Sequence, residues 1–260
     1  MEVYGVDLDG IEGQLIKFGV VKADDGQGVA LLGNAGKVVR EGITRAAEAI
    51  QTLKGKWNIF AGSKYTIDLT PAETPKTSEG LDLPIAIMLL QASIMQSVES
   101  IESAIRRLQD QAKNSKTKEA SRKRILSNLK SLVEQKQRAL EYRQQLGNNR
   151  KKYVLIGKLD ICDGSLVAPH FGMFSLICAA KKGHVLIVPE KSEVHAALVA
   201  EANPGLVVHV AENLQEVWDV ILGERGPRTV RHDSALVKPK ILLNRHIPDF
   251  KDVKGVNKAK

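Results

Sequence analysis

The spacing of hydrophobic and polar positions predicts alternating strands and helices in the first third of the chain. Apolar and polar residues alternate in stretches bounded by glycines at 13–23 and 28–33, and period two returns at 64–70, which is typical of short strands. Over 37–55 the apolar residues recur every three or four positions, which predicts a helix that ends at Gly55. The proline- and threonine-rich stretch 71–80 is then a loop.

A second helix begins with Asp82 in its first turn, where Pro84 is tolerated, and its pattern does not stop. Its apolar seam continues through Ile94, Val98, Ile101, Ile105, Leu108 and Ala112. A polar break at 113–121 interrupts the pattern. The seam resumes at Leu126, Leu129, Val133, Lys136 and Leu140. Residues 93–152 are therefore predicted to form an antiparallel helical hairpin, a coiled coil, inserted in the domain.

The strand and helix patterns alternate again after the hairpin. The predicted elements are a strand at 153–161, a helix at 171–183 capped by Gly183, a strand at 184–189, a helix at 192–202, a strand at 205–210 and a helix at 213–222. Ser192 and Asn213 are the expected N-caps of the last two helices. Repeated βαβ units predict an α/β fold with a largely buried sheet. Residues 1–92 and 153–222 form this domain, and the polar stretch 223–247 has the composition of a linker.

The composition also bears on the cellular location of the protein. The 260 residues are 43% hydrophobic, which is enough for one large core or two modest ones. The start of the chain lacks the features of a signal peptide, and the longest apolar stretch, 83–95, is too short to span a bilayer. Cys162 and Cys178 are the two cysteines. These features predict a cytoplasmic protein that does not associate with a membrane.

The net charge of +8 belongs to one element. Residues 113–152 hold thirteen Lys or Arg and three Glu, so this segment is +10 and the remainder is −2. The candidate nucleic-acid contacts are Lys116, Lys118, Arg122, Lys123, Arg124 and Lys130. Three interpretations of the basic hairpin remain open: a solvated coiled coil, a docking arm for another protein and a DNA contact.

Motifs for cofactors and metals do not match this chain. The turn at Gly36–Lys37 lacks the glycine and the hydroxyl that a phosphate loop needs, because Leu31 and Val38 stand at those positions. The six histidines fall on different predicted elements, without the spacing of metal ligands. No cofactor-binding or metal-binding residue is therefore expected in this chain.

Several segments together resemble one family. The stretch TPAETPKTSEGLDLPIAI at 70–87 resembles the consensus APADLPKEG-x-x-DLPIAI of Mg-chelatase-related proteins of the ComM (YifB) type. The segments at 5–21 and 28–50 resemble the opening strands and first helix of that family, and LIGKLDICDGSLVA at 155–168 is similar to VGELALDGELR. The resemblance covers nearly all of 3–222 except the hairpin, where the family has only a short connection.

The resemblance implies a domain related in fold to the proteolytic domain of Lon proteases, which use a Ser–Lys dyad. By position, the nucleophile of that dyad falls at Asp82 and its lysine near Met173 or Phe174. A carboxylate is not an activated hydroxyl, and neither apolar side chain accepts a proton, so the expected catalytic set is empty. A Lon-type peptidase that uses nearby Ser78 is the alternative.

The last residues, 248–260, resemble the stretch DLADVKGQEHAKRAL that opens the AAA+ ATPase module of the family. The family resemblance therefore implies a module beyond Lys260 that binds ATP and Mg²⁺, with this chain as its non-catalytic N-terminal domain. It also implies a hexameric assembly that acts on DNA in branch migration and recombination during natural transformation. A DNA- or protein-binding module that acts through the basic hairpin is a further alternative.

Overall fold

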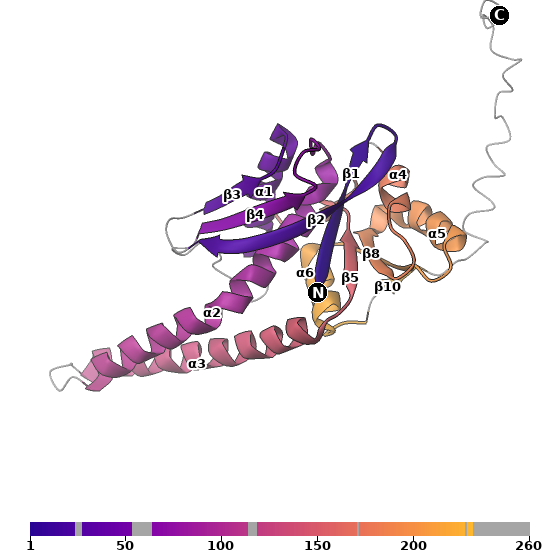
Figure 1. The fold of residues 1–260 in the computed structure, drawn as a ribbon. Helices are drawn as coiled ribbons and strands as arrows, with labels where there is room; N and C mark the ends of the chain where they lie inside the picture. Colours follow the sequence, from indigo (N-terminus) through magenta and orange to yellow (C-terminus); the bar gives the residue numbers. More distant parts are fainter. Residues whose placement is uncertain (24–27, 54–63, 114–118, 171, 227, 231–260) are drawn as a thin grey trace, which may run out of the picture.

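The computed structural model describes residues 1–23, 28–53, 64–113, 119–170, 172–226 and 228–230 (Figure 1). Eight strands form one mixed sheet in the order β10-β9-β8-β5-β1-β2-β4-β3. Their bounds are β1 Glu2–Asp9, β2 Glu12–Ala23, β3 Gly28–Leu32, β4 Lys64–Thr70, β5 Lys152–Leu155, β8 His184–Pro189, β9 Val207–Ala211 and β10 Arg228–Thr229. The short strands β6 (Lys158–Leu159) and β7 (Leu166–Val167) form a separate antiparallel pair.

The sheet has a parallel and an antiparallel region. Strands β1, β5, β8 and β9 are parallel neighbours, whereas β1–β2, β2–β4 and β9–β10 pair antiparallel. The β3–β4 pair at the other end of the sheet is again parallel. This arrangement confirms the predicted α/β class, with a sheet that is mixed.

Along each strand the side chains alternate between the two faces of the sheet, so both faces carry apolar residues. Helices cover both of these faces. The helices are α1 Lys37–Gln51, α2 Asp82–Lys113, α3 Glu119–Asn148, α4 Met173–Cys178, α5 Glu193–Ala202 and α6 Leu214–Leu222, with 3₁₀ turns η1 Glu79–Leu81 and η2 Glu190–Ser192. One buried cluster contains residues of α1, α2 and α6, and the other contains residues of α4 and α5. On β8, for example, Ile187 belongs to the first cluster and Leu186 to the second.

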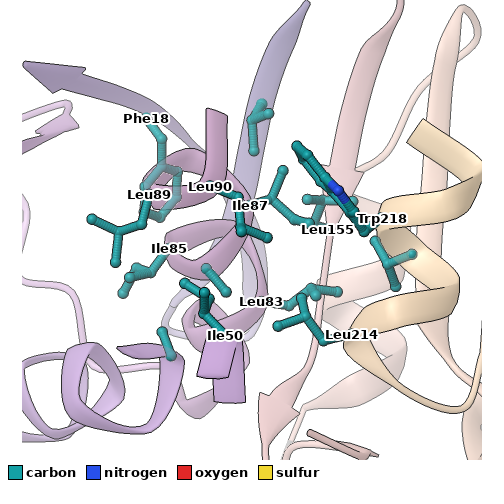
Figure 2. Close-up of a cluster of buried hydrophobic side chains, with 14 of the residues drawn as sticks. Phe18, Ile50, Leu83, Ile85, Ile87, Leu89, Leu90, Leu155, Leu214 and Trp218 are labelled. Atoms are coloured by element: carbon teal, nitrogen blue, oxygen red, sulfur yellow. The ribbon is translucent and has the colours of Figure 1, made fainter. Parts of the chain in front are cut away.

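The first half of α2 is the centre of the larger core. Leu83, Ile85, Ile87, Leu89 and Leu90 are all fully buried. Figure 2 shows them between α1 on one side and Leu214 and Trp218 of α6 on the other. This helix is therefore buried nearly all round, as its continuous apolar sequence predicts.

The second half of α2 leaves the core and lies beside α3 as an antiparallel pair (Figure 1). The predicted α2 seam is confirmed, because all six of its residues are buried or half-buried. The predicted α3 seam is partly wrong: Leu126, Val133 and Leu140 are exposed. Leu129 and Lys136 of the predicted seam do face α2, where Ile125, Leu132 and Ala139 take the place of the other three, and Lys136 Nζ lies 2.8 Å from Glu102 Oε1 of α2. The apolar residues at 125–126 and 132–133 are adjacent in sequence, so two registers fit the pattern equally well.

Among the described residues, no single helix is long and apolar enough to cross a membrane. Residues 79–95 and 97–113 meet such a test on length and composition only as a pair, which is bent by 42°. The first of these two segments lies in the hydrophobic core.

Other sequence predictions differ from the structure at element ends. The helix expected at 171–183 is only Met173–Cys178, so Gly183 does not cap it. Ser192 stands at the N-cap of α5 without a side-chain capping bond, whereas Asn213 Oδ1 accepts the Glu216 N–H at 3.0 Å and confirms the other cap. Strand β1 was not predicted from the sequence as a separate strand. Gly55 lies outside the described residues.

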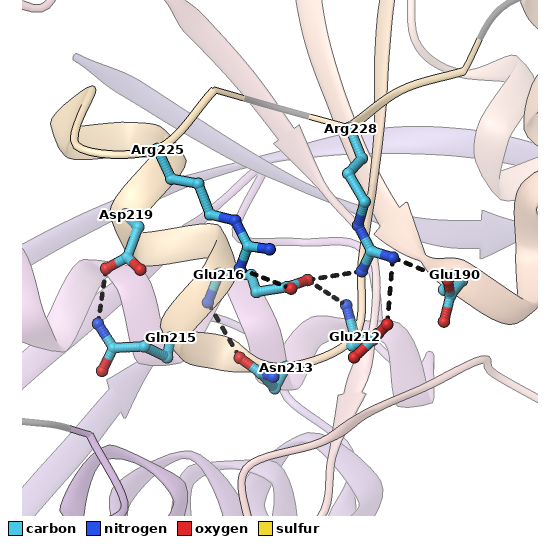
Figure 3. A network of polar contacts seen from close by, with 8 residues as sticks. All are labelled: Glu190, Glu212, Asn213, Gln215, Glu216, Asp219, Arg225 and Arg228. Carbon is cyan, nitrogen blue, oxygen red and sulfur yellow. Dashed lines mark hydrogen bonds and ion pairs between the residues drawn. The ribbon is translucent and has the colours of Figure 1, made fainter.

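The first residues of the predicted linker belong to the fold. After Gly223 ends α6, residues 228–229 form the edge strand β10, and Val230 is buried. An ion-pair network holds this segment (Figure 3). Arg225 Nη1 lies 2.8 Å from Glu216 Oε1, and Arg228 contacts Glu190, Glu212 and Glu216 at 2.8–3.1 Å. Linker composition did not reveal this anchoring because the acidic partners lie in other elements.

The network predicts a loss of stability in acid. Burial opposes the ionisation of Glu216, but the Glu212 N–H, Arg228 and Arg225 outweigh it and hold the pKa of the Glu216 carboxyl below its ordinary value of 4.5. A carboxyl with a lowered pKa stabilises the fold above its unfolded-state pKa, and this contribution is lost as the pH falls through the folded-state pKa. We expect Glu216→Gln to lower the melting temperature at pH 7 and to lower it less below about pH 4.

Calorimetry of Glu216→Gln, with exposed Glu193→Gln as the control, measures this dependence. A constant difference between Glu216→Gln and the wild type across the acid range would contradict the assigned role of the Glu216 carboxylate.

Candidate functional site

The loop 71–78 is held in place by two charged side chains that no sequence pattern singled out. Asp7 of β1 is buried, and its carboxylate accepts the N–H groups of Thr77 at 2.9 Å and Ser78 at 2.7 Å. Lys76 is fully buried, and its ammonium donates to the carbonyls of Pro71 and Thr74. These bonds tie the loop to itself and to the centre of the sheet.

The two groups experience opposite effects of burial. Burial raises the pKa of the Asp7 carboxyl, against the loop N–H groups and the charge of Lys76. Burial lowers the pKa of the Lys76 ammonium, and the carboxylate of Asp7 opposes this shift. Because Asp7 and Lys76 lie on different elements, only the packed loop brings their charges together.

Ser78, the alternative nucleophile, has a local structural role. Its hydroxyl accepts the Gly80 N–H at 3.1 Å and so caps η1, directly before α2. Its own N–H is one of the two that Asp7 holds. Ser78 therefore lies in a turn that is held by hydrogen bonds directly before α2.

Asp82, at the predicted nucleophile position, is closed off by an arginine. The Arg45 guanidinium of α1 donates to the carboxylate at 2.6 Å and 3.0 Å, and the Leu159 N–H of β6 donates at 3.2 Å. The side chain of Asp82 is 2% exposed, and that of Arg45 is 19% exposed. Burial raises the pKa of the Asp82 carboxyl, and the Arg45 guanidinium opposes this shift. The carboxylate joins α1, α2 and β6 and has no open approach for a substrate.

A glycine makes room for this ion pair. A Cβ at Gly42, one turn before Arg45 on α1, would lie 2.3 Å from Asp82 Oδ1. The absence of a side chain there lets α1 come close to the start of α2. In the sequence, Asp82 can be recognised as an acidic residue in the first turn of an apolar helix. Its partner Arg45, 37 positions earlier, has no such recognisable feature.

The two residues at the predicted lysine position lie at the start of α4. Met173 begins α4 and is buried in the cluster with α5, on the opposite face of the sheet from the α2 core. The neighbouring Phe174 is half exposed. In the described part of the chain, no group of three or more His, Cys, Asp or Glu side chains is placed to hold a metal ion.

The predicted nucleic-acid contacts are described only in part. Arg124 and Lys130 are exposed on α3. Arg122 and Lys123 also lie on α3, but their side chains are not described, and Lys116 and Lys118 lie outside the described residues. The described members therefore lie on the part of the helical pair that projects from the sheet (Figure 1).

Residues 20–105 match the family model described as subunit ChlI of Mg-chelatase. This part of the chain is ChlI-like. The ChlI-like region runs from β2 into the second half of α2, and it contains Arg45, Lys76 and Asp82. It ends before α3, so most of the basic helical pair lies outside it. No curated protein matches the chain at a significant level.

Proposed function

We propose that this chain is the non-catalytic, Lon-protease-like N-terminal domain of a ComM-like, Mg-chelatase-related AAA+ ATPase. In this proposal the domain serves hexamer assembly or the positioning of DNA during branch migration and recombination. The observation that carries it is the ChlI-like match at 20–105, in a region where an ion-paired aspartate takes the nucleophile position. The helical hairpin of residues 93–152 is then an insertion into this domain.

ATP and Mg²⁺ chemistry belongs, in this proposal, to the AAA+ module and not to the described residues. Two backbone N–H groups of the glycine turn before α1 donate to carbonyls of the loop 71–78 and so are not directed at a phosphate. The Asn34 N–H donates to the Ala72 carbonyl, and the Gly36 N–H donates to the Lys76 carbonyl at 2.9 Å. A phosphate loop needs such N–H groups to point at the ligand.

ATP hydrolysis and the reading frame test the motor part of the proposal. We expect the purified chain 1–260 to hydrolyse no ATP above a heat-denatured control, with or without DNA. We expect the frame after Lys260 to encode G-x-x-x-x-G-K-[ST] within a few dozen residues. ATP turnover by 1–260 itself, or a frame that encodes no such motif, would contradict the assignment.

The peptidase alternative makes the opposite prediction for a serine-reactive fluorophosphonate. Labelling requires an activated hydroxyl, and Ser78 Oγ is engaged as a cap while Asp82 is a buried carboxylate. We expect no labelling of the wild type or of Asp82→Ser, because the lysine position is Met173 or Phe174. Labelling that disappears in Ser78→Ala would favour the peptidase.

A further inference from the structure

Helix α3 carries a second apolar face beside the one that packs on α2. Leu126, Val133 and Leu140 are 55%, 53% and 40% exposed, although each directly follows a residue that faces α2. We call these three residues the α3 stripe. It is independent of the ChlI-like region, which ends before α3 begins.

The spacing of the stripe is that of a helix-binding seam. Its members are seven residues apart, or two helical turns, so they stack on one side of α3 over about 21 Å. Amphipathic helices recognise a partner helix through apolar residues in this register. Leu129 and Lys136, at the edge of the face that packs on α2, are neighbours of the stripe, so a third helix placed on the stripe would lie beside the α2–α3 pair.

The charges around the α3 stripe indicate what kind of partner can bind it. The described residues three or four positions from its members are Leu129, Lys130, Lys136, Gln137, Arg143 and Gln144, and none of them is acidic. Lys130 and Arg143 are exposed, and Lys136 is turned toward Glu102 of α2. Glu134 and Glu141 follow stripe residues directly and so face about 100° away on a helix.

The residues beside the α3 stripe disfavour the binding of a second copy of this chain, and also the binding of DNA. A second α3 would bring the same basic and neutral flanks against this one, and like charges repel. A phosphate backbone would find the cations but would leave the central aliphatic side chains without an apolar partner. A helix with apolar residues at seven-residue spacing and glutamate or aspartate beside them satisfies both features.

We propose that the α3 stripe is a docking surface for an acidic amphipathic helix of a partner protein. Leu126, Val133 and Leu140 bury their side chains against the apolar seam of that helix, while Lys130 and Arg143 contact its carboxylates. The helical pair is then a protein-docking arm, with α2 supporting α3 from behind.

The test uses the full chain and two fluorescently labelled synthetic helical peptides with the same leucines at seven-residue spacing. One peptide carries glutamate three and four positions from each leucine, and the other carries lysine. In fluorescence anisotropy we expect the acidic peptide to bind at least tenfold more tightly than the basic one, with an affinity that falls as salt rises. Equal binding of both peptides, or binding of neither, overturns the proposal.

Matched variants place the binding on the stripe. Val133→Ser and Lys130→Glu should each weaken the acidic peptide about tenfold, whereas Gln135→Ser and Arg138→Glu, on other faces of α3, should leave it within twofold. All four residues are exposed, and circular dichroism checks that each variant is folded. Sedimentation that shows self-association lost in Val133→Ser would assign the stripe to a second copy. Duplex DNA binding that is lost in Lys130→Glu, without peptide binding, would assign it to DNA.

Discussion

Asp82→Ala is expected to lower the free energy of unfolding by about 3–5 kcal/mol, because it removes one partner of a buried ion pair and leaves the other. The Arg45 guanidinium loses both bonds to the carboxylate, and the Leu159 N–H loses its acceptor. Urea denaturation followed by circular dichroism measures the change. The result would show that Asp82 acts as a structural connection between α1, α2 and β6.

A double-mutant cycle separates the ion pair from the volume of the side chains. Arg45→Met combined with Asp82→Leu replaces both charges by apolar groups, and buried pairs exchanged in this way often lose little stability. We expect the double variant to be more stable than either Asp82→Leu or Arg45→Met alone. A loss below about 1 kcal/mol in Asp82→Ala, the range of exposed pairs, would mean that the ion pair does not hold α1, α2 and β6 together.

Trp218→Ala should lower the free energy of unfolding by a similar amount, about 3–5 kcal/mol, through a cavity in the larger core. Trp218 is 2% exposed and points from α6 toward Ile87 of α2 and Leu155 of β5 (Figure 2). Helix α6 also meets the end of α3, where Asn149 Nδ2 donates to the Ile221 carbonyl at 3.1 Å. The loss is therefore expected to loosen the attachment of the helical pair as well as the core.

Trp218→Phe is the control for this prediction. Within the described part of the chain, the indole N–H of Trp218 has no hydrogen-bond acceptor, so the phenyl ring gives up no bond and keeps most of the apolar contact. Its loss should be well below that of the alanine variant in urea denaturation. Equal losses in the two variants would contradict a cavity as the source of the destabilisation in Trp218→Ala.

The sequence predicted most of the elements and placed the start of α2 as the informative point. It did so because an acidic residue and a proline at the head of a long apolar run are local signals that need no partner. It missed Asp7, Lys76 and Arg45 as site residues. Each of these is an ordinary charged residue until the fold buries it beside a group 37 to 71 positions away, as with Arg45–Asp82 and Asp7–Ser78.

The helical pair shows the same division between local pattern and tertiary contact. Seven-residue spacing in the sequence was enough to predict two long helices with apolar seams. On α3, however, adjacent apolar positions permit two registers, and only packing against α2 buries Leu132 more deeply than Val133. The sequence by itself therefore determined the periodicity, the α/β class and the charge of the projecting element. The tertiary structure alone decided which charges are buried together, which face of α3 is covered and which remains exposed, because these depend on contacts between residues far apart in the chain.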